Sequence, residues 1–475
     1  MKARKKRSLK VVLISILALI AVLVTAIFIL WHFSWRPTFR FSDNLGSNAI
    51  AHETLPDKTG FAADALLLVK TIEEVHPIFA TDDWLSADYF EIRNEFLAYS
   101  QNPDITRTDF AFAATRYITT LRDGHMNMTL LKETDDGQWL RAIFGGRADI
   151  SWLIQDEHLF LLDEGGALTE TLVTEIGGVP TNTILSIAER YFYPENEADR
   201  IRMLSDISRL GDIIARAGGD TSGNAVTIAL YEGGQESTVQ VPMLSIEEIV
   251  AATPTFDFII RYEMFDDIFF IHLRSFVNGD HITEVVHSIE QAIEDGIRKF
   301  IVDLRGNGGG ASIAGQRLLE AMGITIPRFG AIRRISDLVA ETHGGILPLL
   351  NFVGVDSLRF NSTTSTASNP NDVFISVLTD HFSYSSATMM GVWVQDGGFG
   401  NIIGSPSSNS PTNFGDWGGS LDLPYSRTYV SFISFTRWLR PDEDADPVTL
   451  WPDIMVSPGE DALDAALEFL RNLER

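Results

Sequence analysis

Phe300-Ile-Val-Asp-Leu-Arg-Gly-Asn-Gly-Gly-Gly310 joins a continuous apolar run to a glycine-rich turn, and the helical pattern Ala314–Met322 follows it. An uninterrupted apolar strand is typical of a sheet that is covered on both faces. Val373–Thr379 repeats this arrangement, because the second apolar run leads through a short polar turn into the helical pattern Ser385–Gln395. Strands that alternate with helices predict an α/β layer with a mostly buried sheet.

The same alternation extends over residues 250–475, which we expect to form one α/β core. Its other predicted strands are Ile268–Leu273, Asn401–Gly404 and Tyr429–Ser434, and its other predicted helices are Ile282–Ile297 and Glu460–Leu473. Residues 362–371 are polar and predict a loop.

Two further modules precede this core. Residues 61–135 show helical spacing of apolar side chains and predict a helical module. Residues 145–245 contain short apolar runs and glycine turns, which predict a small β-rich domain with inserted helices. The strands expected there are Leu159–Leu162, Val226–Tyr231 and Thr238–Val241.

The N-terminal segment has the pattern of a membrane anchor. Val11–Trp31 is 21 residues long and carries no charge, and a cluster of lysines and arginines precedes it. About 20 apolar residues cross a bilayer as a helix, and basic clusters stay on the cytoplasmic side. We therefore expect residues 1–34 to form a cytoplasmic tail and a single transmembrane helix in the cell membrane. We expect residues 35–60 to form a stalk and the body to be extracytoplasmic. A cleaved signal peptide is the alternative, although its apolar region is usually only about 7–15 residues long.

Composition excludes several classes of function. The net charge is -27, and an acidic body repels phosphate backbones, so we expect no nucleic-acid partner. The chain has no cysteine, which excludes disulfides, thiolate metal sites and cysteine nucleophiles. Its ten histidines form no H-x-x-x-H pair, so we expect no catalytic metal and no cofactor. The oligomeric state has no signature in the sequence.

Three short stretches have residues suited to catalysis. The turn at 306–310 lets backbone N–H groups converge, but its spacing fits neither a dinucleotide fingerprint nor a P-loop. Ser383, Ser385 and Ser386 lie at a helix start, where a serine is either an N-cap or a nucleophile favoured by the helix dipole. His125 follows an Asp-Gly turn and is a candidate general base.

Seven motifs occur in one order along the chain. They are Leu121-Arg-Asp-Gly-His125, Ile268-Phe-Phe-Ile-His-Leu-Arg-Ser-Phe276, Ile301-Val-Asp-Leu-Arg-Gly-Asn-Gly-Gly-Gly310, Ser383–Met390, Ile402-Ile-Gly404, Trp451-Pro-Asp-Ile454 and Gly459-Glu-Asp461. In this order the chain resembles the C-terminal processing (tail-specific) and tricorn-type serine peptidases over roughly residues 62–475. The resemblance implies a crotonase-like layering of the core, a PDZ-like module around Thr174–Pro180 that binds chain ends, and peptide or unfolded protein substrates.

The resemblance also implies roles for individual residues. It places the nucleophile on Ser385 and the oxyanion hole on the backbone N–H groups of Ser386 and of the Gly308-Gly309 turn. One branch of the family uses a lysine base about 25 residues after the serine. Here that position falls near Ser410, and Lys299 is the last lysine of the chain, so a serine–lysine pair with this topology is excluded.

The tricorn-like branch uses an earlier histidine, which His125 matches, and a carboxylate for which Asp453 is the stand-in, with Asp303 as a second supporting acid. We favour His125 over His381 as the base. Thr388 stands where the family usually carries glutamate. That departure, with the missing lysine, keeps open the alternative of an inactive protein that binds peptides or another ligand on the same scaffold.

Overall fold

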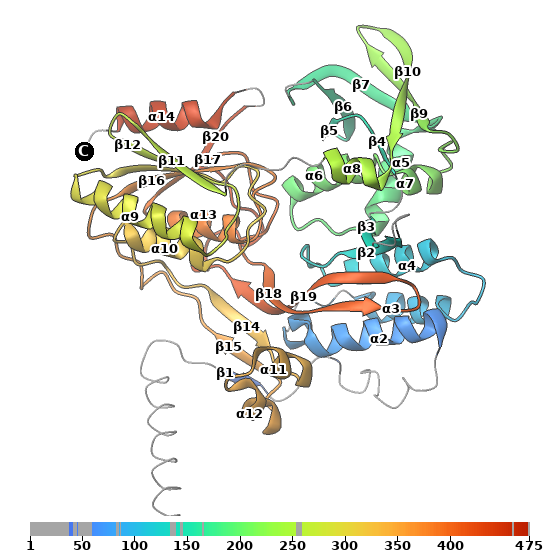
Figure 1. Cartoon of the computed structure of the whole chain (residues 1–475), viewed down its shortest axis with the longest axis horizontal. Helices are drawn as coiled ribbons and strands as arrows, with labels where there is room; N and C mark the ends of the chain where they lie inside the picture. Colours follow the sequence, from blue (N-terminus) through green and yellow to red (C-terminus); the bar gives the residue numbers. More distant parts are fainter. Residues whose placement is uncertain are drawn as a thin grey trace, which may run out of the picture.

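The structure is a computed structural model that describes residues 38–40, 45, 59–81, 85, 87–133, 139–142, 146–163, 166–252, 259–457 and 460–473 (Figure 1). The predicted tail and anchor at 1–34 and most of the predicted stalk at 35–60 lie outside these residues. Among the described helices, none combines the length and apolar character needed to span a bilayer.

The core sheet is mostly parallel and carries the predicted alternation of strands and helices. Its order is β11 (Ile260–Phe265), β12 (Ile268–Leu273), β13 (Lys299–Asp303), β16 (Phe374–Thr379), β17 (Gly400–Gly404) and β20 (Ile454–Met455). Only the β11–β12 pair is antiparallel. Three neighbouring parallel strands, β13, β16 and β17, therefore end at the same edge, where their following loops meet.

Helices cover both faces of this sheet, which confirms the buried α/β layer. On one face lie α9 (Asp280–Glu294), α10 (Ile313–Ala321) and α13 (Ser386–Asp396), packed on side chains such as Phe300, Val302 and Val377. On the other lies α14 (Ala462–Asn472), packed on Ile301 and Leu378. Successive strand residues point to opposite faces, so an apolar residue at every position is what two covered faces require.

A second sheet links the core to the N-terminal helices. Its order is β1 (Thr38–Arg40), β15 (Ser357–Phe360), β14 (Gly330–Arg334), β19 (Thr428–Leu439), β2 (Met128–Glu133) and β3 (Trp139–Ala142), with β18 (Phe414–Leu423) beside β19. Figure 1 shows β18 and β19 reaching from the core toward the helical region. That region consists of α2 (Gly60–Val75), η3 (Pro77–Ala80), α3 (Tyr89–Tyr99) and α4 (Arg107–Thr119).

The expected helical pattern is wrong at its C-terminal end. Residues 128–133 form strand β2, which pairs with β19 through Met128↔Val430 and its neighbours. Apolar spacing over a short segment fits a helix and a strand alike, and here the distant partner strand decides.

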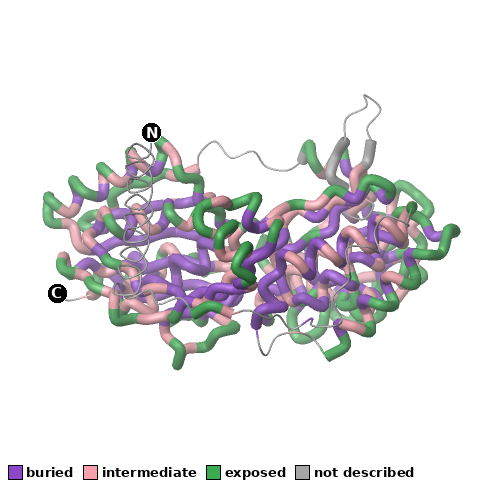
Figure 2. The backbone as a smooth tube through the Cα atoms, turned by 90° about the horizontal axis from the view of Figure 1, so that it is seen from below, coloured by how far each residue is buried: buried purple, intermediate pink, exposed green. Residues whose placement is uncertain are grey.

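The β-rich region forms its own sheet, as predicted. Its order is β4 (Arg147–Ala148), β10 (Gln235–Leu244), β9 (Ala225–Glu232), β7 (Leu168–Ile176), β6 (His158–Leu162) and β5 (Trp152–Gln155), with β8 (Val179–Pro180) beside β7. Inserted helices are α5 (Thr181–Ala188), η4 (Glu189–Tyr191), α6 (Glu197–Ile207), α7 (Gly211–Arg216) and α8 (Ile246–Ala252). Buried segments run through the interior of both halves of the molecule (Figure 2).

A small lobe follows β14. It contains α11 (Asp337–His343) and α12 (Leu347–Phe352) and ends in β15. Its own apolar cluster includes Ala331, Ile335, Val355 and Leu358, against which Leu350 packs.

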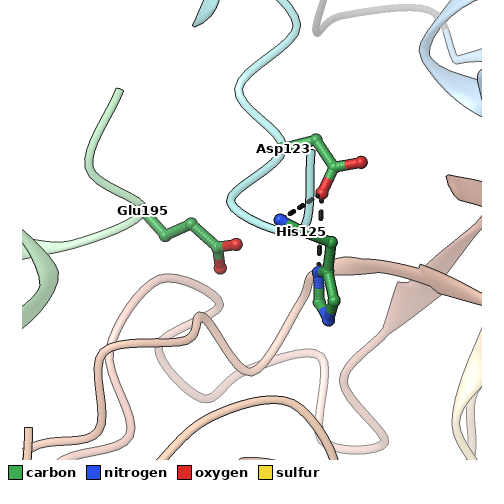
Figure 3. Close-up of side chains that lie close together, drawn as sticks. All are labelled: Asp123, His125 and Glu195. Atoms are coloured by element: carbon green, nitrogen blue, oxygen red, sulfur yellow. Dashed lines mark hydrogen bonds and ion pairs between the residues drawn. The ribbon is translucent and has the colours of Figure 1, made fainter. Parts of the chain in front are cut away.

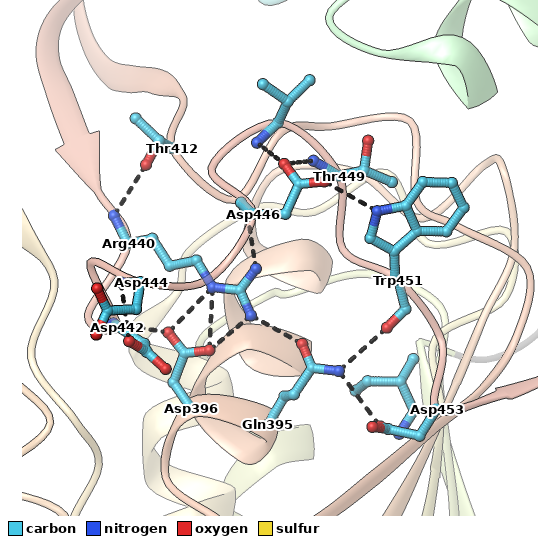
Figure 4. A network of polar contacts seen from close by, with 12 residues as sticks. Gln395, Asp396, Thr412, Arg440, Asp442, Asp444, Asp446, Thr449, Trp451 and Asp453 are labelled. Carbon is cyan, nitrogen blue, oxygen red and sulfur yellow. Dashed lines mark hydrogen bonds and ion pairs between the residues drawn. The ribbon is translucent and has the colours of Figure 1, made fainter.

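A buried ion pair fixes the C-terminal loops to helix α13. The Arg440 guanidinium donates to both carboxylate oxygens of Asp396, to Gln395 Oε1 and to the Asp446 carbonyl (Figure 4). The side chains of Arg440 and Asp396 are only 5% and 1% exposed. An ion pair this deeply buried tolerates the joint loss of both charges better than the loss of one.

Replacing only one partner of this pair should therefore destabilise the fold. We expect Arg440→Met to lower the free energy of unfolding by roughly 3–5 kcal/mol, because it leaves the Asp396 carboxylate buried without its cation. The double variant Arg440→Met/Asp396→Leu should lose less. Urea denaturation of the three proteins measures the effect, and a double variant less stable than Arg440→Met would contradict this account.

Candidate active site

Ser385 lies at the N-cap of α13 in a strained backbone conformation. Its φ of 54° and ψ of -117° place a non-glycine residue in a region that L-amino acids rarely adopt. Such strain persists only where the surroundings enforce it, and it is concentrated at functional sites. Two contacts do so here. Asn409 Oδ1 accepts a hydrogen bond from Ser385 N–H at 3.0 Å, and a Cβ on Gly309 would lie 2.7 Å from Ser385 Cβ. The glycine turn after β13 thus packs directly against Ser385.

The structure separates the three candidate serines by their partners. Ser383 Oγ donates to the Leu304 carbonyl at 2.8 Å and is fully buried. Ser386 Oγ donates to the Gly310 carbonyl at 2.6 Å. Both hydroxyls thus tie the helix start to the glycine turn, whereas the Ser385 hydroxyl faces a histidine.

That histidine is His125, whose Nε2 lies 3.0 Å from Ser385 Oγ. It comes from the turn between α4 and β2, 260 residues away in sequence. The rings of Tyr384 and Phe432 flank the imidazole at 5.0 and 5.3 Å between centroids. Its side chain is 11% exposed. The separation lies within the range of about 2.6–3.2 Å that proton transfer requires.

Asp123 is the carboxylate that faces His125, a role that the motif at 121–125 did not predict. Its Oδ1 accepts from the His125 backbone N–H at 2.9 Å and lies 3.5 Å from His125 Nδ1 (Figure 3). The second distance is that of an ion pair rather than a well-aligned hydrogen bond. A carboxylate at Nδ1 favours the proton on that nitrogen, which leaves Nε2 free to accept the serine proton.

His76 holds the other side of the same carboxylate. Ile78 N–H donates to His76 Nδ1 at 3.3 Å, so the His76 proton is on Nε2, which lies 3.1 Å from Asp123 Oδ2. Both side chains are fully buried. Asp123 is therefore fixed from two sides, by His76 and by the backbone of the turn that carries His125.

The pKa shifts of Asp123 and His125 agree with this arrangement of His76, Asp123 and His125. Burial acts to raise the pKa of Asp123, but its contacts with His125 and His76 outweigh burial and hold that pKa far below its usual range. Burial acts to lower the pKa of His125, but Asp123 and the more distant charges of Glu195 and Asp416 raise it overall. Asp123 is thus ionised at neutral pH and stabilises the imidazolium that a general base becomes.

Glu195 is a second carboxylate near the site, and it enters from the loop before α6. Its Oε1 accepts from Gly124 N–H at 3.1 Å and from the Tyr384 hydroxyl at 2.6 Å. Its Oε2 accepts from Asn409 Nδ2 and from Ser410 N–H. Burial raises the pKa of Glu195. Glu195 therefore joins the loop that carries His125, the residue before Ser385 and the loop after β17.

The predicted oxyanion hole is altered in one position. Gly309 N–H donates to Asn307 Oδ1 at 2.8 Å, so it is already engaged. Among the described residues, the N–H groups of Gly308 and Ser386 have no hydrogen-bond partner. Ser386 N–H lies at the first turn of α13, where helix dipoles favour negative charge. Gly308 and Ser386 remain as the candidate donors.

The other predicted site residues have other partners. Asp453 Oδ2 accepts from Ile402 N–H at 2.7 Å and from Gln395 Nε2 (Figure 4), and Asp303 accepts from Arg305 through both oxygens. His381 accepts from Ser408 through its backbone carbonyl, and its ring lies tilted against that of Phe382. Thr388 is buried in α13, and its hydroxyl has no partner within the described residues. The carboxylate beside His125 is thus Asp123, in place of Asp453 or Asp303.

The loop at Ser410 occupies the place expected for a lysine. Ser410 N–H donates to Glu195 Oε2 at 2.9 Å, and Ser410 Oγ donates to the Glu195 carbonyl at 3.1 Å. Its neighbour Asn409 binds Ser385 N–H. The loop after β17 therefore reaches Ser385 N–H through the Asn409 amide and reaches Glu195 through the Ser410 backbone N–H.

Asp123, His125 and Glu195 also lie close enough to be considered as metal ligands, because one atom of each falls within 4.8 Å of the others (Figure 3). However, both carboxylates already accept hydrogen bonds from N–H or O–H donors. Such donors satisfy a carboxylate without a cation. The cluster is therefore accounted for as a hydrogen-bond network.

Known proteins are similar to this chain in the part that carries the site. Residues 267–415 match the model of peptidase family S41, a span that includes Ser385 and the glycine turn. No curated protein matches the sequence. The structure of mature CPAF is 13% identical, covers 86% of this chain and 96% of its own, and superposes with a TM-score of 0.58. The complex of mature CPAF with lactacystin is 12% identical, with coverages of 86% and 97% and a TM-score of 0.56.

The photosystem II D1 C-terminal processing protease is 12% identical over 85% of this chain and 94% of its own, with a TM-score of 0.44. At these identities, the likeness to CPAF shows a shared fold. The family match spans the strand, turn and helix that carry the candidate nucleophile. On this evidence, the chain is a serine-type peptidase whose residues 267–415 are similar to family S41.

Proposed function

We propose that this peptidase hydrolyses peptide bonds through a Ser385–His125–Asp123 triad. The observation that carries the proposal is the 3.0 Å contact between His125 Nε2 and Ser385 Oγ, at a serine whose backbone is strained. Ser385 Oγ attacks the peptide carbonyl while His125 Nε2 takes its proton. The N–H groups of Gly308 and Ser386 stabilise the oxyanion.

The remaining steps release the two products and regenerate the Ser385 hydroxyl. His125 gives its proton to the leaving amine as the C–N bond breaks, and an acyl group remains on Ser385. Water, deprotonated by His125, then hydrolyses this ester and regenerates the hydroxyl. Asp123 keeps the imidazole in one tautomer throughout, and His76 holds Asp123.

A cleft that Ser385 and His125 do not line, but that reaches Asp380 and His381 near them in sequence, is the proposed path of the substrate chain. It has a volume of about 710 Å³ and lies between the β-rich domain and the core. Ile154, Leu162 and Leu168 line one side, and Asp380 and His381 line the other, just before Ser385. The β-rich domain would bind the substrate chain end, as the PDZ-like resemblance implies.

The predicted anchor determines on which side of the membrane we expect the peptidase body to lie. If residues 11–31 span the membrane with the basic tail inside, the body and its substrates are extracytoplasmic. We therefore propose a membrane-held peptidase that acts on extracytoplasmic peptides or unfolded proteins. Peptide binding without turnover is the alternative function.

A fluorophosphonate probe, which reacts with activated serines, tests the nucleophile and its base. We expect wild-type protein to be labelled and Ser385→Ala to be unlabelled. His125→Ala should slow labelling by about 10²–10⁴-fold, because the hydroxyl then loses its proton acceptor.

His381→Ala is the matched control, and it should label at close to the wild-type rate. Labelling of Ser385→Ala at the wild-type rate would refute the assignment of the nucleophile. A wild-type protein that retains peptides but neither labels nor cleaves them would establish the binding alternative.

The pH dependence tests Asp123. A general base acts in its neutral form, so labelling should fall as the pH drops through the pKa of His125. Against the effect of burial, the carboxylate of Asp123, with Glu195 and Asp416 farther away, raises that pKa above the ordinary value of about 6.5. Asp123→Asn should move the midpoint to lower pH and reduce the maximal rate, on the order of 10³-fold. A midpoint unchanged by Asp123→Asn would exclude Asp123 as the partner of His125.

Exchanging the donor and acceptor groups of Glu195 and Asn409 tests whether their hydrogen bond supports Ser385. All four contacts of the Glu195 carboxylate are with donors, so the NH₂ of Glu195→Gln must meet at least one of them. If the new NH₂ faces Asn409, the Asn409 side-chain amide must rotate to present its oxygen to it. The Asn409 NH₂ then points at Ser385 N–H, so that two donors face each other. We expect Glu195→Gln to slow labelling on the order of tenfold to a hundredfold.

The double variant Glu195→Gln/Asn409→Asp should recover part of this loss. The carboxylate that Asn409→Asp introduces accepts from the new amide and from Ser385 N–H together. The matched control is Asn409→Asp alone, in which two carboxylates face each other. If the fold loss in labelling rate of the double variant equals the product of the two single-variant fold losses, the two residues do not act as one unit.

A further inference from the structure

Helix α12 is apolar on two opposite faces. Leu347 and Leu350 pack against the small core of its lobe. The other face exposes four side chains, which we call the apolar ridge: Ile346 (50% exposed), Leu349 (51%), Phe352 (87%) and Val353 (54%). A helix that is apolar all round is normally buried on all sides. The exposed face therefore calls for a partner.

The ridge also lacks charge. Residues 344–355 read Gly-Gly-Ile-Leu-Pro-Leu-Leu-Asn-Phe-Val-Gly-Val and contain no charged residue, in a chain whose net charge is -27. Single exposed apolar residues are ordinary on protein surfaces, but contiguous ones mark interaction sites. Strand β1 adds Phe39, which is 44% exposed, to the same lobe.

The incoming chain reaches the body at this lobe. The uncharged run ends at Trp31, and β1 begins at Thr38, so seven steps of chain join them. Seven residues span at most roughly 25 Å. The Arg40 carbonyl accepts from Asp356 N–H at 2.9 Å, which joins the end of β1 to the segment that follows α12. Figure 1 shows α12 and β1 together at the lower edge of the molecule.

We propose that the apolar ridge inserts into the outer interface of the lipid bilayer, beside the point where the chain leaves the membrane. The strength of interfacial binding scales with the apolar area that a helix face buries among the lipids, and the ridge offers large apolar side chains for this contact. A second copy of this chain is a poorer occupant. Stable protein interfaces bury about 1,200–2,000 Å² in total, more than the four ridge side chains on this short helix and its two flanking residues provide. The inference takes its location from the proposed anchor, but its test is separate.

The absence of cysteine allows a direct test with the full chain. Phe352→Cys carries an environment-sensitive NBD fluorophore, and the protein is placed in phosphatidylcholine nanodiscs with or without bromine on the lipid acyl chains. Val250→Cys is the matched control, since Val250 is also about half exposed (52%) and lies on α8, beside the β-rich sheet and away from α12 (Figure 1). Leu19→Cys reports insertion of the anchor independently.

We expect the label at position 352 to shift its emission to the blue and to be quenched several-fold more by brominated lipid than the label at 250. An unshifted and unquenched label at 352 would overturn the inference, whatever the label at 19 reports. A blue shift at 352 without bromine quenching, together with dimers in crosslinking, would also overturn it and assign the ridge to a second copy. If brominated lipid quenches the label at 352 but not the label at 19, the anchor is rejected and the insertion of the apolar ridge is supported. None of these readouts depends on peptidase activity.

Discussion

The 3.0 Å contact between His125 Nε2 and Ser385 Oγ depends on segments that are far apart in sequence. The serine stands at the carboxyl edge of the core sheet, where the loops after β13, β16 and β17 meet. The histidine stands on the loop between α4 and β2, which belongs to the other sheet. Strands β18 and β19 join the two parts, and Phe432 on β19 packs against the imidazole. The site exists only when both sheets are assembled.

Buried polar groups hold this assembly in place. Asp123 binds the backbone of its own turn and His76, while Glu195 ties the same turn to Tyr384 and to the loop of Asn409. A buried carboxylate is costly without donors, and each of these has them. The network therefore fixes a strained serine and a distant histidine at one distance. Within it, the Asn409 amide links Ser385 to Glu195.

Much of the fold was predictable from local pattern. The core strands are apolar runs bounded by glycine turns, and their order along the chain defines a parallel sheet covered by helices. Ser385 and His125 were selected from motifs, and the structure brings them together. Residues 128–133 were misassigned to a helical module because their strand is specified by β19, which is distant in sequence.

The carboxylates were harder to assign for the same physical reason. Asp123 lies two residues before His125, and only the turn geometry, with Arg122 at a φ of 57°, directs its carboxylate back to the imidazole. Asp453 had the expected position in sequence, but it caps the backbone of β17 instead. Glu195 and Asn409 belong to no recognisable pattern, since their role arises from loops that meet only in the folded chain.

The central claim is that a histidine-activated Ser385 forms an acyl-enzyme. Acid quenching during turnover of an activated ester, followed by peptide mapping, tests it most directly. We expect a stoichiometric burst of the leaving group and an acyl adduct on Ser385, which His125→Ala no longer accumulates at the wild-type rate. An adduct on Ser383 or Ser386, or turnover with no adduct and no burst, would contradict it.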